Sequence, residues 1–104
     1  VQQIIDITEE NFSNPQLSIS IIAKELAYNA KYISHLFKQK MGVGYTEYLR
    51  IYRINYAIML LDHGIDSVKN IASLSGFSNP MYFSSVFKQT VGVSPSEYNS
   101  KQSG

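Results

Sequence analysis

The chain has 104 residues, of which 44% are hydrophobic and 16% are charged, and its formal net charge is +1. This length fits one domain or two small subdomains that share a core, and the chain is too apolar to be disordered. No Cys is present and no run approaches the ~18 apolar residues of a membrane span, so we expect neither a disulfide framework, nor a thiolate metal site, nor a membrane anchor. Since the chain begins with Val1 and not with Met, we expect a fragment of a longer protein.

The first part of the chain predicts three helices. Residues 2–12 form an amphipathic segment that Asn14-Pro15 ends. Ser18 and Asn29 can cap the next two helices, because their side-chain oxygens accept hydrogen bonds from free N–H groups of a first turn. The third helix covers about residues 30–41, and Gly42 suits the left-handed position that ends it. The apolar residues of the first segment are Ile4, Ile5, Ile7 and Phe12.

A long helix is predicted over residues 45–62, where apolar residues recur with a period of 3.6 and Gly64 is the stop signal. At ~1.5 Å per residue this helix spans about 27 Å. Three tyrosines of this helix, and Tyr98 later in the chain, are assigned to core packing: Tyr45, Tyr48 and Tyr56. The apolar positions are Tyr45, Tyr48, Leu49, Tyr52, Tyr56, Ala57, Leu60 and Leu61.

The last part predicts a second pair of helices and a short final one. Ser67 caps the first of the pair and Gly76 ends it. The second covers about residues 80–91, begins at Asn79-Pro80 and ends at Gly92, because Pro fits the first helical position. A capping box over residues 94–97 starts the final helix.

The chain contains an internal repeat. Residues 29–48 and 79–98 align at an offset of 50 with ten identical positions of twenty, and Ile22-Ala23 matches Ile71-Ala72 at an offset of 49. Two copies are too few for a solenoid, which needs about three. We therefore predict an all-α domain of about seven helices: two helix-turn-helix subdomains, residues 1–44 and 63–104, joined by a connector helix over residues 45–62.

Charge and topology favour DNA as the partner. Residues 1–10 carry −3, whereas residues 29–56 carry +4 and residues 68–92 carry +2. An α-helix fits the major groove of B-DNA, and two recognition helices must lie about 34 Å apart to enter successive grooves, a distance of the order of the connector's length. The outward positions of the second helix of each copy are polar or charged, apart from one methionine: Lys31, Ser34, His35 and Lys38, and Met81, Ser84, Ser85 and Lys88.

Several runs together resemble the DNA-binding domain of the AraC/XylS family of bacterial transcription regulators, over about residues 5–99. They are Leu17–Ala23, Tyr32–Lys38, Gly42 with Glu47–Leu49, Arg53-Ile54 with Ala57, Ile71-Ala72, Gly76–Ser84, Phe87-Lys88 and Gly92–Tyr98.

The resemblance implies sequence-specific binding of double-stranded DNA by a C-terminal domain that follows a sensor domain or a receiver domain. It implies base-reading residues in the helices over 30–41 and 80–91, and phosphate contacts around them. The base-reading residues would be Lys31, Ser34, His35, Met81, Ser84 and Ser85. The phosphate contacts would be Asn29, Tyr32, Lys38, Arg53, Asn79, Tyr82 and Lys88.

Two positions depart from the family pattern. His35 and Ser85 stand where many members carry Arg, which reads guanine with two hydrogen bonds worth roughly 1–3 kcal/mol of discrimination. We therefore expect the first copy to carry most of the sequence specificity. The second copy would mainly hold the phosphate backbone, or touch thymine methyl groups through Met81.

Alternatives remain at some residues and for the function. Tyr32 and Tyr82 fit a phosphate contact and a packing role equally well, and a structural role for Arg53 rivals phosphate binding. A helical protein-interaction module is the second hypothesis, with RNA polymerase as a candidate partner. No nucleophile–base pair, metal-ligand set or cofactor motif is apparent, so we expect a cytoplasmic protein that is not an enzyme, with no metal and no cofactor.

Overall fold

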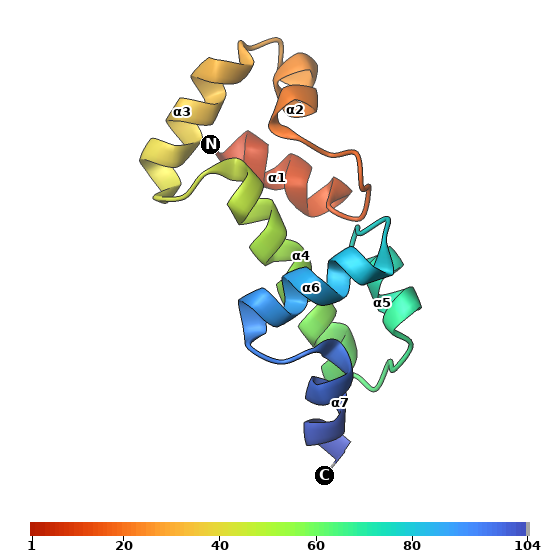
Figure 1. Ribbon diagram of the computed structural model, residues 1–104. Coiled ribbons are helices and arrows are strands. Elements are labelled where there is room, and N and C mark those ends of the chain that lie inside the picture. The colour runs from red at the N-terminus through yellow and green to blue at the C-terminus, as the bar shows by residue number, and fades with distance from the viewer. Residues whose placement is uncertain (104) are drawn as a thin grey trace.

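The computed structural model describes residues 1–103, with side chains to residue 99. In this part of the chain all the regular secondary structure is α-helix, and turns and loops connect the helices (Figure 1). The prediction of an all-α fold with about seven helices is confirmed. None of the helices within residues 1–103 is long and apolar enough to cross a membrane. The helices are α1 (Gln2–Asn11), α2 (Ile19–Leu26), α3 (Ala30–Met41), α4 (Tyr45–Asp62), α5 (Val68–Leu74), α6 (Pro80–Val91) and α7 (Pro95–Ser103).

Side-chain caps begin the paired helices at the predicted residues. Ser18 Oγ accepts from the backbone N–H of Ile21 at 3.3 Å, and Ser67 Oγ accepts from that of Asn70 at the same distance. At the second helix of each pair, Asn29 Oδ1 and Asn79 Oδ1 accept from the backbone N–H groups of residues 32 and 82, each at 3.2 Å. Each such cap is worth about 1 kcal/mol, so these four residues fix where the helices start.

Left-handed residues end the helices and differ between the copies at one position. Gly42 and Gly92 follow α3 and α6 with φ of 81° and 100°. Between the paired helices, the second copy has Gly76 at φ 92°, and the equivalent residue of the first copy is Ala27 at φ 61°. An L residue thus occupies the left-handed position of the first turn, so backbone conformation alone does not explain the glycine of the second turn.

Two clusters of buried side chains form the core, and α4 contributes to both. Helices α1, α2 and α3 pack on the first half of α4, while α5, α6 and α7 pack on its second half (Figure 1). The residues that α4 gives to the first cluster are Tyr45 and Leu49; those it gives to the second are Ile54, Ala57, Leu60 and Leu61.

The single apolar stripe predicted for the connector is incomplete. Ile54 is fully buried although it lies outside that stripe, whereas Tyr48, Tyr52 and Tyr56 are only half-buried. Ile54 comes five residues after Leu49, which places it about 140° further round the helix. The reason is that the two subdomains pack on different sides of α4, so its buried face turns as the helix passes from one core to the other.

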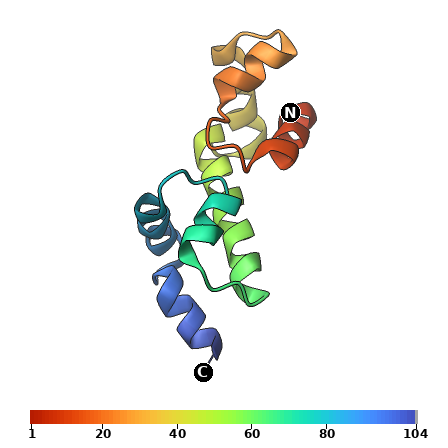
Figure 2. The same ribbon diagram turned by 90° about the vertical axis from the view of Figure 1, so that its right-hand side faces the viewer.

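The domain is elongated, with extents of 48 × 23 × 21 Å. Figure 2 shows the two subdomains arranged along α4, from α2 and α3 at one end to α7 at the other. The 48 Å axis is long enough for two recognition helices about 34 Å apart. Gly104, the last residue of the second predicted subdomain, lies outside the described residues.

Candidate nucleic-acid interface

The outer face of α3 carries three residues predicted to read bases and one predicted phosphate contact, Lys38. Lys31, His35 and Lys38 are exposed and Ser34 is half-buried, while Ile33 and other apolar residues of the same helix face the core. These four polar residues also line one shallow depression of about 440 Å³, together with residues at the start of α2 and α3. The structure therefore brings this half of the predicted site together on one open surface.

The outer face of α6 repeats this arrangement with different chemistry. Met81 is 83% exposed, Ser85 and Lys88 are exposed and Ser84 is half-buried. Each has the same burial class as its counterpart fifty residues earlier on α3. The two helices thus present equivalent positions to solvent, but α6 offers a thioether and two hydroxyls where α3 offers an ammonium, a hydroxyl and an imidazole.

Asparagine and tyrosine mark the start of both helices. The Oδ1 atoms of Asn29 and Asn79 cap the helix N-termini, which leaves their amide N–H groups as donors. Tyr32 and Tyr82 are 58% and 60% exposed, and each ring lies beside one aromatic neighbour, at 6.2 and 6.1 Å between centroids. Packing therefore covers less than half of each tyrosine. The first turn of α6 offers no free N–H group to an anion, because Pro80 has none and those of Met81 and Tyr82 donate to Asn79 Oδ1.

The recognition helices α3 and α6 carry basic side chains and no acidic ones. Lys38 and Lys88 are exposed, and neither forms an ion pair with any of the described side chains of residues 1–99. The acidic residues of the N-terminal segment are exposed on α1. An unpaired ammonium on the outer face of each recognition helix is free to meet a polyanion.

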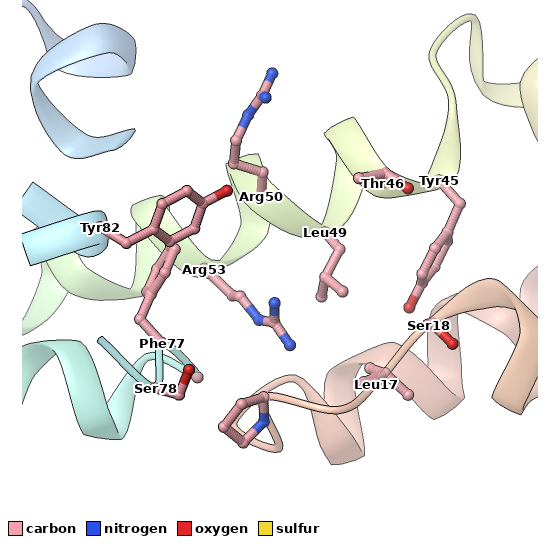
Figure 3. Close-up of a pocket in the computed structure, with 12 residues that line it drawn as sticks. Leu17, Ser18, Tyr45, Thr46, Leu49, Arg50, Arg53, Phe77, Ser78 and Tyr82 are labelled. Carbon is pink, nitrogen blue, oxygen red and sulfur yellow. The ribbon is translucent and has the colours of Figure 1, made fainter. Parts of the chain in front are cut away.

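A cleft of about 280 Å³ lies between the two subdomains beside α4 (Figure 3). It brings together two of the predicted phosphate contacts, Arg53 and Tyr82, with Arg50 at its edge. Arg50 is exposed and lies 3.5 Å from Glu47 in an ion pair. Arg50 is therefore a second guanidinium beside this cleft, with no role predicted from the sequence.

Arg53 makes contacts inside the protein. Its Nε donates to the carbonyl oxygen of Phe12 at 2.9 Å, and its Nη2 donates to that of Asn14 at 2.8 Å. Burial lowers the pKa of this guanidinium below its ordinary value, but Arg keeps its charge at neutral pH. Arg53 therefore has the structural role that was the alternative to phosphate binding: it donates hydrogen bonds to backbone carbonyls and does not pair with an acid. The phosphate contact stays a prediction.

Gly76 packs against the same Phe12 carbonyl and Arg53 side chain, and the three residues form a junction that was not predicted from the sequence. A Cβ at this position would overlap with the carbonyl oxygen of Phe12 and lie 2.7 Å from Nε of Arg53. Gly64 has nearly the same φ, yet a Cβ there would meet nothing within 4 Å. The available signal was the difference between the copies, since Ala27 stands in the first copy where Gly76 stands in the second.

Comparison with known proteins gives consistent matches. The model of a family described as "Helix-turn-helix domain", which is of the AraC type, matches residues 22–101. The uncharacterized transcriptional regulatory protein YesN of Bacillus subtilis is 36% identical over 107 residues, a match that covers 100% of this chain and 29% of that protein. The chain therefore spans less than a third of the length of this relative.

Solved structures share the fold. The C-terminal domain of the two-component response regulator yesN from Fusobacterium nucleatum has a TM-score of 0.90 and 28% identity, with 94% of this chain and 95% of that chain covered. The DNA-binding domain of AdpA, solved in complex with a target DNA, has a TM-score of 0.89 at 21% identity, with 96% and 89% covered. At that identity the second likeness shows the fold alone. With the family match over most of its length, the chain belongs to the AraC-type helix-turn-helix family, whose members are DNA-binding domains of transcriptional regulators.

Proposed function

We propose that this domain binds a specific double-stranded DNA sequence by inserting α3 and α6 into successive major grooves, and so directs a larger regulator to its promoter. The carrying observation is that two helices of one chain expose the same positions. Base reading falls to Lys31, Ser34, His35, Met81, Ser84 and Ser85. Phosphate contacts fall to Asn29, Tyr32, Lys38, Asn79, Tyr82 and Lys88, and on the sequence resemblance also to Arg53.

Further support comes from shape and charge. Subdomains 1–44 and 63–104 each hold one recognition helix, and the 48 Å long axis accommodates two helices one DNA turn apart. The AdpA domain, which has the same fold, was solved bound to DNA. Since the relative YesN is more than three times as long as this chain, we propose that the whole protein carries a sensor or receiver domain before this one. RNA polymerase is a further proposed partner. We also propose a cytoplasmic location, because that is where the bacterial chromosome lies.

The test is selection of bound duplexes from a random pool of ~25 base pairs, followed by affinity measurements against salt. Enrichment of two blocks one helical turn apart is expected if both helices enter the major groove. A single block would mean that α6 only clamps the backbone. An affinity that is flat in salt, without enrichment, would remove the DNA function and leave a protein-interaction module as the function to test.

Replacing His35 with Ala is expected to relax the preference at one base position of the first half-site, because the exposed imidazole can form a hydrogen bond with one base edge. The measurement is binding to the selected operator and to its single-base variants, where one position should lose most of its discrimination. His63→Ala is the matched control, since this other exposed histidine lies at the far end of α4 and bonds Met59 O at 2.8 Å. Equal effects of both changes at all positions would contradict base reading by His35.

Replacing Lys38 or Lys88 with Ala is expected to weaken binding to all sequences and to lower the salt slope by about one unit each, because each ammonium neutralises one phosphate. The slope is obtained from affinities measured between low and moderate salt. Lys40→Ala is the charge-matched control: Lys40 is exposed on α3 but lies about 200° round the helix from Lys38. Should Lys38→Ala change sequence preference and keep the slope, the assigned roles are wrong.

A further inference from the structure

The backbone carbonyl of Phe12 is contacted by Arg53 of α4 and by Gly76 of the second subdomain. Phe12, just after α1, belongs to the first subdomain, and its carbonyl oxygen accepts the 2.9 Å hydrogen bond from Nε of Arg53. Figure 3 shows the Arg53 side chain extending from α4 toward the segment that joins α1 to α2. The second bond, to the carbonyl oxygen of Asn14 at 2.8 Å, makes the contact bidentate, so it fixes the orientation of the segment as well as its position.

The second subdomain packs against the same carbonyl oxygen of Phe12. Gly76, in the turn between α5 and α6, approaches it so closely that no Cβ fits. The equivalent turn of the first copy accepts Ala27, so the requirement for glycine comes from this approach and not from the turn itself. Elements from the two subdomains and from α4 therefore meet at one point.

Aromatic packing fixes the ring of the same residue. Phe12 lies 5.1 Å from the ring of Tyr52 and 4.7 Å from that of Tyr56, between centroids, and both tyrosines belong to α4. Its side chain and its carbonyl are thus both attached to the connector helix. A shift of the end of α1 along α4 would break these ring contacts, and a shift relative to the turn between α5 and α6 would disturb the packing of Gly76 on the Phe12 carbonyl.

We propose that Arg53 is a positioning residue which sets the angle and spacing between α3 and α6, and thereby the half-site spacing that the domain accepts. The two recognition helices belong to different core clusters, so this junction and α4 are what couple them. A rotation of about 10° acting over roughly 20 Å moves a helix by about 3.5 Å, close to the ~3.4 Å rise of one base pair. The inference rests on the proposed insertion of both helices into DNA.

A DNA-free experiment tests the junction first. Because the chain has no Cys, the pair Gln39→Cys and Gln89→Cys, exposed and equivalent on α3 and α6, can carry spin labels that report the distance between the two helices. Arg53→Met is expected to broaden the distance distribution at a temperature where circular dichroism shows the variant folded. Arg53→Lys, which keeps the charge and one donor group, should broaden it less and serves if the Met variant does not fold. An unchanged distribution in both variants would overturn the proposal.

DNA binding then tests the consequence for the operator. Affinity is measured for the selected operator, for versions with one base pair added or removed between half-sites, and for a single half-site. Arg53→Met is expected to lower the preference for the native spacing about tenfold. This preference is the ratio of two operator affinities, so any loss that is common to all duplexes cancels from it. Arg50→Met, the charge-matched control one turn earlier on α4, should keep that preference.

The outcomes separate this inference from the proposed function. A loss of affinity in Arg53→Met that is equal for all spacings and for the single half-site, with a salt slope lower by about one unit, would make Arg53 a phosphate contact only and overturn the positioning role. A wild-type domain that binds one half-site as tightly as two would overturn the proposed insertion of both helices. In that case a broadened distance in Arg53→Met would still support the junction, but not its effect on the operator.

Discussion

Replacing Gly76 with Ala is expected to lower the free energy of unfolding by about 2–5 kcal/mol. The left-handed backbone costs an L residue about 1–2 kcal/mol, and the overlap of the new Cβ with the Phe12 carbonyl adds the cost of moving a packed segment. Urea denaturation followed by circular dichroism measures the change. The substitution presses on the carbonyl that Arg53 holds, so the preference for one half-site spacing should weaken in the variant that remains folded.

Gly64→Ala is the matched control for Gly76→Ala. Gly64 has φ of 90°, against 92° at Gly76, but open space where the Cβ would lie. The control should therefore lose only about 1–2 kcal/mol for the left-handed conformation. Equal losses at the two glycines would show that the close approach contributes nothing and would weaken the argument for the junction.

Replacing Phe87 with Ala is expected to lower the free energy of unfolding by about 3–5 kcal/mol, because the ring is fully buried in the second core cluster. Its ring lies 5.8 Å from that of Phe83 and 6.0 Å from that of Tyr98, between centroids, and Ala would lose both contacts. Small domains have a total stability of about 5–15 kcal/mol, so this loss is a large share of it, and the whole domain should unfold at a markedly lower temperature. Thermal unfolding followed by circular dichroism checks this.

The control for Phe87→Ala is a substitution in the same helix, α6. Gln89→Ala changes an exposed residue two positions later and should alter stability by less than about 0.5 kcal/mol. Since α4 belongs to both cores, we expect Phe87→Ala to unfold in one transition seen equally by far-ultraviolet circular dichroism and tyrosine fluorescence. Two separate transitions would show that the subdomains fold independently of each other.

Local signals in the sequence were sufficient for the helices and for the outward faces. Ser18, Asn29, Ser67 and Asn79 cap where predicted, because a cap is an interaction between residues three apart and is encoded locally. The repeat at offset 50 placed α3 and α6 in register, and the four outward positions of the two helices then matched in burial. For the same reason the polar outer face of each recognition helix could be read from helical periodicity alone.

The faces of α4 and the junction could not be read in this way. Helical periodicity identifies the buried residues only where a helix has one buried face. Because α4 packs on two cores on different sides, the fully buried Ile54 was not predicted. Arg53 stands 41 residues from its partner Phe12, and nothing local distinguishes a guanidinium that will cap carbonyls from one that will meet phosphate.

The sequence by itself determined that this is an all-α, twofold helix-turn-helix chain, and which residues of each recognition helix face outward, since caps, turns and periodicity act over a few residues. Only the tertiary structure decided how the two halves are held together, through Arg53 and Gly76 on one carbonyl. That contact joins three segments distant in the chain, and its geometry exists only after both cores have packed on α4.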